Sequence, residues 1–188
     1  MSARPDGHPR SSASISVVGV GNILYRDEGV GVYAARYLQQ AYRFEPAIEV
    51  ADGAALGFSV MDSFEDSSTV IVLDALLAGA APGTVYRLPT ERLLDLGPDV
   101  TPTAHEVDPI HVLKRARALG QSTDMVLLGI VPQDASQMAV GLTPTLAAAF
   151  PRFVDAALDE IRAHGVRAEP LRAMSLHDVI EGLVSSAA

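Results

Sequence analysis

The chain carries five runs rich in apolar residues, separated by segments in which apolar residues repeat at helical spacing. The runs are rich in β-branched residues, as strands are, and cover residues 15–20, 47–51, 69–73, 84–88 and 124–131. The first, third and fifth runs consist almost entirely of Val, Ile and Leu, which is typical of strands buried on both faces. The pattern therefore predicts a sheet whose central strands have no solvent-facing side.

Helical repeats lie between and after these runs. They cover residues 28–43, 57–66, 108–120 and 143–164. Asp108 is the predicted N-cap of the third helix, with Pro109 at its first helical position, where no amide donor is needed. Pro151 lies inside the last repeat and removes a backbone donor there, so we expect a kink or a restart of that helix.

Strands that alternate with helices over 188 residues predict one α/β domain of ordinary size. We expect a three-layer α/β/α sandwich with a twisted, mostly parallel five-stranded sheet over residues 15–165. Residues 1–14 are polar and have no apolar signal core, so they predict a flexible N-terminal tail. Residues 166–188 form a C-terminal extension, within which 176–184 predict a short amphipathic helix.

Composition narrows the classes of function. Hydrophobic residues make up 48% of the chain, which is enough for a core. Lys and Arg number 14 against 23 Asp and Glu, and the net charge of -9 disfavours binding to nucleic acid or to anionic membranes. The absence of cysteine excludes disulfides, thiolate metal sites and a Cys nucleophile. No apolar run reaches the about 20 residues of a membrane span, and we expect a cytoplasmic protein.

Carboxylates follow three of the predicted strands. Glu28 comes soon after the first strand, Asp52 follows the second, and Asp74 follows the third. Because ligands bind at the carboxyl ends of parallel strands, this edge of the sheet is the expected site. Several buried carboxylates need a cation or shared protons to offset the cost of their burial, which is a physical reason to expect a metal.

Each of these carboxylates also has a purely structural interpretation. Glu28 can stabilise the dipole of the helix that follows it, although Asp27 beside it is the better cap or dipole residue of the two. Asp74 fits equally well as a metal ligand and as an acceptor of backbone N–H groups from the next loop. Asp52, which precedes Gly53, fits an Asx-type turn.

The first loop does not support a dinucleotide site. The pattern G-x-G-x-x-G begins with Gly19 and Gly21 but requires glycine at the position of Leu24. Asp27 and Glu28 also place two negative charges where a pyrophosphate would approach the helix. The two glycines instead predict a tight turn with a close approach of strand and helix.

Two of the five histidines, His105 and His111, lie near the third predicted helix. His105 lies in a polar loop, from which an imidazole can reach the edge of a sheet, although a lone loop histidine more often faces solvent. The chain contains neither a His-Glu-x-x-His helix nor a Gly-x-Ser-x-Gly elbow. The residues by themselves therefore leave the role of His105 open.

Several short motifs, each present once, follow one another along most of the chain. They are Val18-Gly19-Val20-Gly21-Asn22-Ile23-Leu24, Asp27-Glu28-Gly29-Val30-Gly31, Asp52-Gly53, Asp74-Ala75, Pro82-Gly83-Thr84, Ala104-His105-Glu106, Gly129-Ile130-Val131-Pro132 and Gly141-Leu142-Thr143-Pro144-Thr145. Each motif alone is weak, but the ordered set closely resembles the hydrogenase maturation endopeptidases. Two departures are Ala54, where the family often has glycine, and the acidic segment with Pro109 that follows His105.

The resemblance implies a cytoplasmic endopeptidase that removes a C-terminal extension from the large-subunit precursor of a nickel–iron hydrogenase once nickel has been placed. It implies a twisted sheet with helices on both sides, and it implies that Glu28, Asp74 and His105 are metal ligands. Two carboxylates and one imidazole suit nickel, zinc or manganese. We expect the metal to be nickel supplied within the precursor, with zinc or manganese as a surrogate, and Asp52 to act as a supporting acid or base.

Two other functions stay open at this point. The protein could be a self-contained metal-dependent hydrolase or peptidase that keeps its own zinc or manganese. It could also be a non-catalytic α/β domain that binds a metal or a nucleotide. Metal content of the purified chain distinguishes the first function from an enzyme that meets nickel on its substrate, and nucleotide binding would favour the second.

Overall fold

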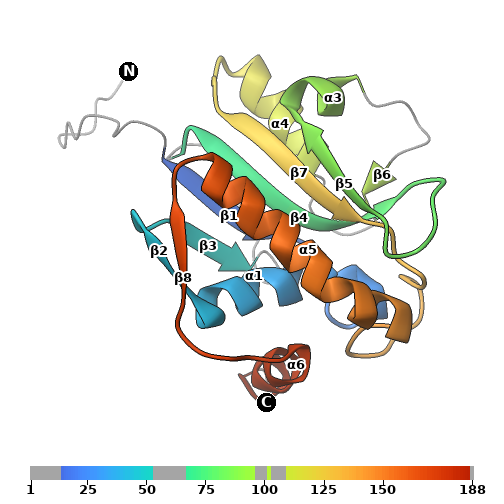
Figure 1. Cartoon of the computed structure of the whole chain (residues 1–188). Coiled ribbons are helices and arrows are strands. Elements are labelled where there is room, and N and C mark those ends of the chain that lie inside the picture. The colour runs from blue at the N-terminus through green and yellow to red at the C-terminus, as the bar shows by residue number, and fades with distance from the viewer. Residues whose placement is uncertain (1–13, 53–66, 96–100, 103–108, 187–188) are drawn as a thin grey trace.

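The fold is built on a six-stranded sheet (Figure 1). The structure is a computed structural model, and it describes residues 14–52, 67–95, 101–102 and 109–186. The strands, in their order across the sheet, are β3 (Glu49–Asp52), β1 (Ile15–Gly19), β4 (Thr69–Leu77), β7 (Asp124–Ile130) and β5 (Val85–Pro89), with the short β6 (Thr101–Pro102) paired to β4. The first four are parallel, whereas β5 and β6 run antiparallel to their neighbours. The predicted α/β sandwich with a mostly parallel sheet is confirmed.

Helices cover both faces of this sheet (Figure 1). One face packs against α1 (Val30–Ala41), α5 (Pro144–Ala163) and α6 (Leu176–Ser186), and the other against α3 (Thr90–Leu94) and α4 (Pro109–Ala118). None of the helices in the described part of the chain combines the length and the apolar character that a membrane span requires.

The central strand β4 divides its side chains between the two faces. Leu73 and Ala75 belong to the apolar cluster under α1 and α5, whereas Val72 and Leu76 belong to the cluster under α4. Since side chains alternate along a strand, Asp74 shares the α4 face with Val72 and Leu76. This placement decides which segments of the chain can meet its carboxylate.

A second, two-stranded sheet was not predicted. The first helix ends at Ala41, two residues before the expected end, because Tyr42 takes an extended backbone with φ -131 and ψ 150. Strand β2 (Tyr42–Glu45) then pairs antiparallel with β8 (Arg167–Pro170), from the expected C-terminal extension. The prediction that residues 42–43 continue the helix is wrong, since this long-range pairing outweighs their local helical spacing.

The last long helix runs without interruption through Pro151, so the restart expected there does not occur. Pro151 is exposed, and its neighbours Phe150 and Phe153 are buried against the sheet. Packing of this apolar face holds the helix together despite the missing backbone donor. Thr143 caps its start, as the side-chain oxygen accepts from the N–H of Leu146.

Two further predicted helices are present, and three other predictions fall on residues that the structure does not describe. Helix α4 begins at Pro109, and α6 matches the amphipathic pattern expected near the C-terminus, so both predictions are confirmed. The helix expected over 57–66, the N-cap Asp108 and the tail up to residue 13 lie outside the described residues.

Candidate active site

The carboxylates singled out in the sequence come from segments that end at one edge of the sheet. Glu28 lies in the 3₁₀ turn η1 (Arg26–Gly29), which connects β1 to α1. Asp74 lies near the end of β4, where it pairs with Gly129 of β7. Asp52 is the last residue of β3 and pairs with Gly19 of β1, which places its backbone at the same edge. Because these strands are parallel, their carboxyl ends lie side by side.

Glycines allow the start of α1 to lie directly on the strand ends. A Cβ atom on Gly31 would lie 2.1 Å from the carbonyl oxygen of Leu73, and one on Gly19 would lie 2.1 Å from the carbonyl oxygen of Gly31. Any side chain at these positions would push the helix away. Glu28 precedes Gly31 by three residues and Asp74 follows Leu73, and η1 contacts β4 directly. The glycine contacts therefore bring the two carboxylate-bearing segments together.

Both of these carboxylates are buried. Asp74 is 0% exposed, and its Oδ1 accepts a hydrogen bond of 2.7 Å from the amide of Ala75. Glu28 is 5% exposed. An ionised carboxylate loses solvation when it is buried, and a bound cation or a proton can offset this cost. Carboxylate oxygens of this kind suit a divalent metal.

The third predicted ligand, His105, lies outside the described residues, between Pro102 of β6 and Pro109 of α4. Among the residues that the structure describes, no group of three His, Cys, Asp or Glu side chains could hold a metal ion. The structure thus brings together the segments of Glu28 and Asp74, and it describes the two segments that flank His105. The side chain of Asp52 is also outside the description.

Asp27 lies in the first turn of η1, as expected of a residue that stabilises a helix dipole, but the prediction that it caps the helix is wrong. It is 0% exposed, and neither η1 nor α1 has a side-chain cap. Its carboxylate instead accepts hydrogen bonds from the amides of Gln133, Asp134 and Thr143 and from the Thr143 hydroxyl. These donors lie 106 to 116 residues further along the chain, so no local sequence signal could have revealed them.

A second set of hydrogen bonds joins the same two segments. The Tyr33 hydroxyl accepts from the amide of Gly141 (3.0 Å) and donates to the carbonyl of Ile23 (3.3 Å). Burial raises the pKa of Tyr33 above its usual value, and the Gly141 hydrogen bond opposes this in part. The Ala139 amide donates to the carbonyl of Leu24, and the Arg26 amide donates to the carbonyl of Ala139. The turn that carries Glu28 is therefore fixed from outside its own sequence.

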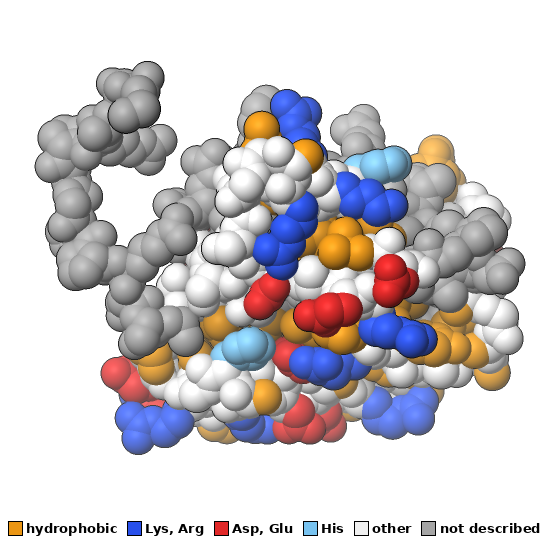
Figure 2. Space-filling model, turned by 90° about the horizontal axis from the view of Figure 1, so that it is seen from above, with side chains coloured by type: hydrophobic (Ala, Val, Ile, Leu, Met, Phe, Trp, Pro, Cys, Tyr) orange, Lys and Arg blue, Asp and Glu red, His pale blue; other side chains and the backbone are white. Residues whose placement is uncertain are grey.

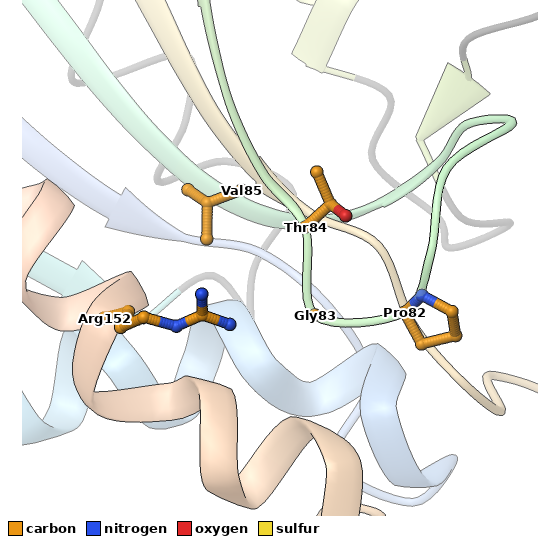
Figure 3. A pocket seen from close by; sticks show the side chains of 5 residues that line it. All are labelled: Pro82, Gly83, Thr84, Val85 and Arg152. Carbon is orange, nitrogen blue, oxygen red and sulfur yellow. The ribbon is translucent and has the colours of Figure 1, made fainter.

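One pocket near this edge lies on the opposite side of the sheet from Asp74. It has a volume of about 360 Å³, and its lining residues are Pro82, Gly83, Thr84, Val85 and Arg152 (Figure 3). The side chain of Arg152 extends from α5 towards the loop at Gly83 (Figure 3). Val85 packs against the apolar cluster under α1 and α5, whereas Asp74 alternates onto the α4 face. The pocket therefore does not lie on the face of the sheet that carries Asp74.

A fourth buried carboxylate among the described residues, Glu160, lies on the flank of the domain. Its two oxygens accept from Nε and an Nη of Arg87 on β5 at 2.6 and 2.9 Å, and His164 lies 3.3 Å away. Hydrogen bonds from Arg87 lower the pKa of Glu160, and the same hydrogen bonds raise the pKa of Arg87.

Acidic and basic side chains are interspersed on the face shown in Figure 2. That face thus lacks, in its described part, the continuous basic surface expected for nucleic-acid binding.

Comparison with known proteins identifies the family. The family model described as hydrogenase maturation protease matches residues 32–160. The hydrogenase 2 maturation protease of Escherichia coli K12 is 32% identical over 167 residues, covering 87% of this chain and 99% of that protein. The HupD hydrogenase expression/formation protein of Thiocapsa roseopersicina is 28% identical over 158 residues, covering 84% of this chain and 72% of that protein.

A solved structure supports the same assignment. The hydrogenase maturating endopeptidase HybD from E. coli superposes with a TM-score of 0.70 at 29% identity, covering 84% of this chain and 98% of that chain. The [NiFe] hydrogenase maturation protease HybD from Thermococcus kodakarensis shares the fold, with a TM-score of 0.63 at 21% identity over 78% of this chain and 98% of that chain. The chain therefore belongs to the hydrogenase maturation protease family, and it is a hydrolase that acts as an endopeptidase.

Proposed function

We propose that this endopeptidase removes the C-terminal extension from a hydrogenase large-subunit precursor that already contains nickel. The observation that carries the proposal is the pair of buried carboxylates, Glu28 and Asp74, on segments that meet at the carboxyl edge of the sheet in a member of this protease family. Negative charge concentrated at this edge is suited to a substrate that presents a cation.

His105 completes the proposed ligand set. Pro102 pairs with Leu76, which lies two residues beyond Asp74 on the same face of β4. Three residues of extended chain span at most about 11 Å, so the chain can bring His105 from Pro102 to the neighbourhood of Asp74. Helix α4, which begins four residues after His105, packs on that same face. The fold thus supports the proposal from both sides of the histidine.

The chemistry of these ligands fits nickel as part of the substrate. Two carboxylates and one imidazole provide borderline-hard donors, and three protein ligands leave coordination positions for other groups. A bound metal can polarise a carbonyl and acidify a water molecule. Glu28, Asp74 and His105 would recognise the metal in the precursor and hold the scissile peptide bond beside it.

Asp52 is the proposed supporting acid or base. It ends β3, two strands away from Asp74, at the edge where the other proposed site residues lie. A carboxylate there could orient the attacking water or the peptide and transfer a proton during cleavage.

The experiment that tests this proposal measures processing of a nickel-loaded precursor by single variants. Asp74→Asn and His105→Ala should each abolish processing, with circular dichroism unchanged. Matched controls are Asp159→Asn and His177→Ala, whose side chains are exposed and pair with other residues on their own helices. Normal processing by both the Asp74 and the His105 variants would refute the ligand assignment.

Metal content distinguishes this proposal from a self-contained metallohydrolase. An enzyme that meets nickel on its substrate should be purified with little tightly bound metal and should cleave no general peptide. Stoichiometric zinc or manganese in the active protein, together with cleavage of simple peptides, would instead establish a resident metal. Calorimetric binding of a nucleotide would point to the binding-domain alternative.

A further inference from the structure

We infer that Asp27 is a positioning residue for the cleavage reaction, which acts by fixing the turn that carries Glu28. The inference rests on the proposed function, in that it takes Glu28 to be a ligand for the metal of the substrate. It assigns to Asp27 no contact with substrate or metal. Its role is instead to join the turn η1 to the loop at 132–143 and to the start of α5.

Both carboxylate oxygens of Asp27 accept hydrogen bonds from distant parts of the chain. Its Oδ1 accepts from the Thr143 amide at 2.7 Å. Its Oδ2 accepts from the amides of Gln133 and Asp134 and from the Thr143 hydroxyl, each at 2.9 Å. The Asp27 amide also donates to the carbonyl of Asp134 at 3.2 Å. One residue thereby connects two segments that are distant in sequence.

The contacts of Asp27 are all of one kind, because all four groups that approach its two oxygens are donors. An asparagine would direct its NH₂ group at one or more of these donors. The geometry of the hydrogen bonds therefore distinguishes aspartate from asparagine at this position.

The loop that binds Asp27 is stabilised by hydrogen bonds of its own. The Oδ1 of Asp134 accepts from the Ser136 amide, the Ser136 hydroxyl and the Gln137 amide at 2.9 to 3.1 Å. Thr143 accepts from the Leu146 amide while its hydroxyl donates to Asp27. The donors are therefore held in place by a folded loop and by a helix of 20 residues.

The turn η1 is short and lacks a side-chain cap. It begins at Arg26, whose φ of 41 is in the left-handed region that disfavours a side chain. Strained backbone of this kind persists only where the surroundings impose it. The Arg26 amide donates to the carbonyl of Ala139, and Asp27 adds its own contacts with the same loop one residue away from Glu28. Displacement of a ligand by a fraction of an ångström is enough to weaken a metal site.

The decisive variants change Thr143 and leave both carboxylates intact. Thr143→Val removes the hydroxyl that donates to Asp27, and Thr143→Ser keeps it. Titration calorimetry with Ni²⁺ alone should show the affinity of Thr143→Val about tenfold weaker, as expected when a group that orients a metal ligand is lost, while Thr143→Ser stays within about twofold of the wild type. Asp27→Asn should weaken Ni²⁺ affinity further, by up to about a hundredfold.

Loss of stability alone must be separated from loss of positioning. Glu160→Gln serves as the stability control, because it removes a charge on the flank and touches neither the turn nor the loop. Its melting temperature should fall while its Ni²⁺ affinity stays at the wild-type value. If Asp27→Asn does not fold, the Thr143 pair still decides the question.

Two results would overturn the inference, and they differ in what they mean for the proposed function. If Glu28→Gln weakens Ni²⁺ binding but Thr143→Val and every folded Asp27 variant bind as the wild type does, only the positioning role is wrong. If Glu28→Gln itself binds Ni²⁺ normally, Glu28 is not a ligand, and the positioning role falls together with that part of the proposed function.

Discussion

Two glutamates, Glu28 and Glu160, are almost equally buried but lie in different regions of the molecule. Glu28 is 5% exposed and Glu160 is 6% exposed. Glu160 packs between a helix and an edge strand, where the Arg87 guanidinium and His164 balance its charge. Glu28 lies at the carboxyl edge of the sheet, next to Asp27 in sequence and in a turn that contacts the strand that carries Asp74.

The comparison shows that burial by itself does not reveal the role of a carboxylate. On the flank, the chain supplies the opposite charge, and the result is a stable connection between α5 and β5. At the sheet edge, two buried carboxylates lie on segments that contact each other, and burial of carboxylates at such an edge is a feature of functional sites. The first arrangement serves the fold, and the second serves the proposed reaction.

The largest expected effect comes from exchanging each of these glutamates for glutamine. Glu28→Gln should reduce processing of the nickel-loaded precursor by more than about a hundredfold, because a metal ligand is lost. Its melting temperature should stay the same or rise, since glutamine keeps the size of the side chain and removes the cost of burying a charge. Glu160→Gln should process normally. A processing assay read by mass spectrometry and thermal melts of both variants check this prediction, and the reverse pattern would break the comparison.

A smaller effect is expected when the basic partner on the flank is removed. Arg87→Ala should destabilise the protein by about 1–2 kcal/mol, because two charge-assisted hydrogen bonds are lost. Solvent around the half-exposed guanidinium weakens these hydrogen bonds and so limits the loss of stability. Arg43→Ala is the matched control, since its pair with Glu169 is exposed on both sides, and it should change stability by less than about 0.5 kcal/mol. Urea unfolding measures both values. Equal effects of the two variants would show that the buried pair has no special role.

The flank should also respond to pH in a defined direction. Hydrogen bonds from Arg87 lower the pKa of Glu160 from 4.5, so the folded state favours the ionised carboxylate, with His164 contributing in the same sense. The stabilisation is therefore complete above pH 4.5 and is lost as the pH falls through the lower, folded-state pKa. The difference in melting temperature between wild type and Glu160→Gln should shrink as the pH falls below 4.5. A constant difference down to pH 3 would contradict this account.

The smallest expected effect tests whether the position of Glu28 depends on Asp27 or on the other hydrogen bonds between the turn η1 and the loop at 132–143. Tyr33→Phe removes the hydrogen bonds to Ile23 and Gly141, and it should cost about 0.5–1 kcal/mol because water can reach the half-buried Gly141. Its Ni²⁺ affinity should change less than that of Thr143→Val. A Tyr33→Phe variant with the weaker Ni²⁺ affinity of the two would show that the tyrosine, not Asp27, sets the position of Glu28.

The framework of this fold is readable from the sequence. The apolar runs at 15–20, 69–73 and 124–131 predict three of the central strands because strands buried on both faces need continuous apolar residues. The Thr143-Pro144 start of α5 is equally local, since a capping oxygen followed by proline acts within one turn. Both features depend on neighbouring residues and so can be inferred without coordinates.

Contacts between distant segments could not be inferred in this way. The pairing of β2 with β8 joins residues about 125 positions apart, and Tyr42 by itself extends a helical pattern. Asp27 has its partners on a loop that follows the last central strand. The positions of Glu28 and Asp74 after strands predict a place at the carboxyl edge of the sheet, and both side chains are buried. Their roles as ligands, and that of His105, stay predictions.

The central claim is that this endopeptidase recognises nickel in its substrate. The most direct test incubates the purified protein with a hydrogenase large-subunit precursor prepared with and without nickel, and follows the intact mass of the precursor. The account predicts loss of a C-terminal fragment from the nickel-loaded precursor only, and no loss when Glu28→Gln replaces the wild-type enzyme. Equal cleavage of the nickel-free precursor would contradict it.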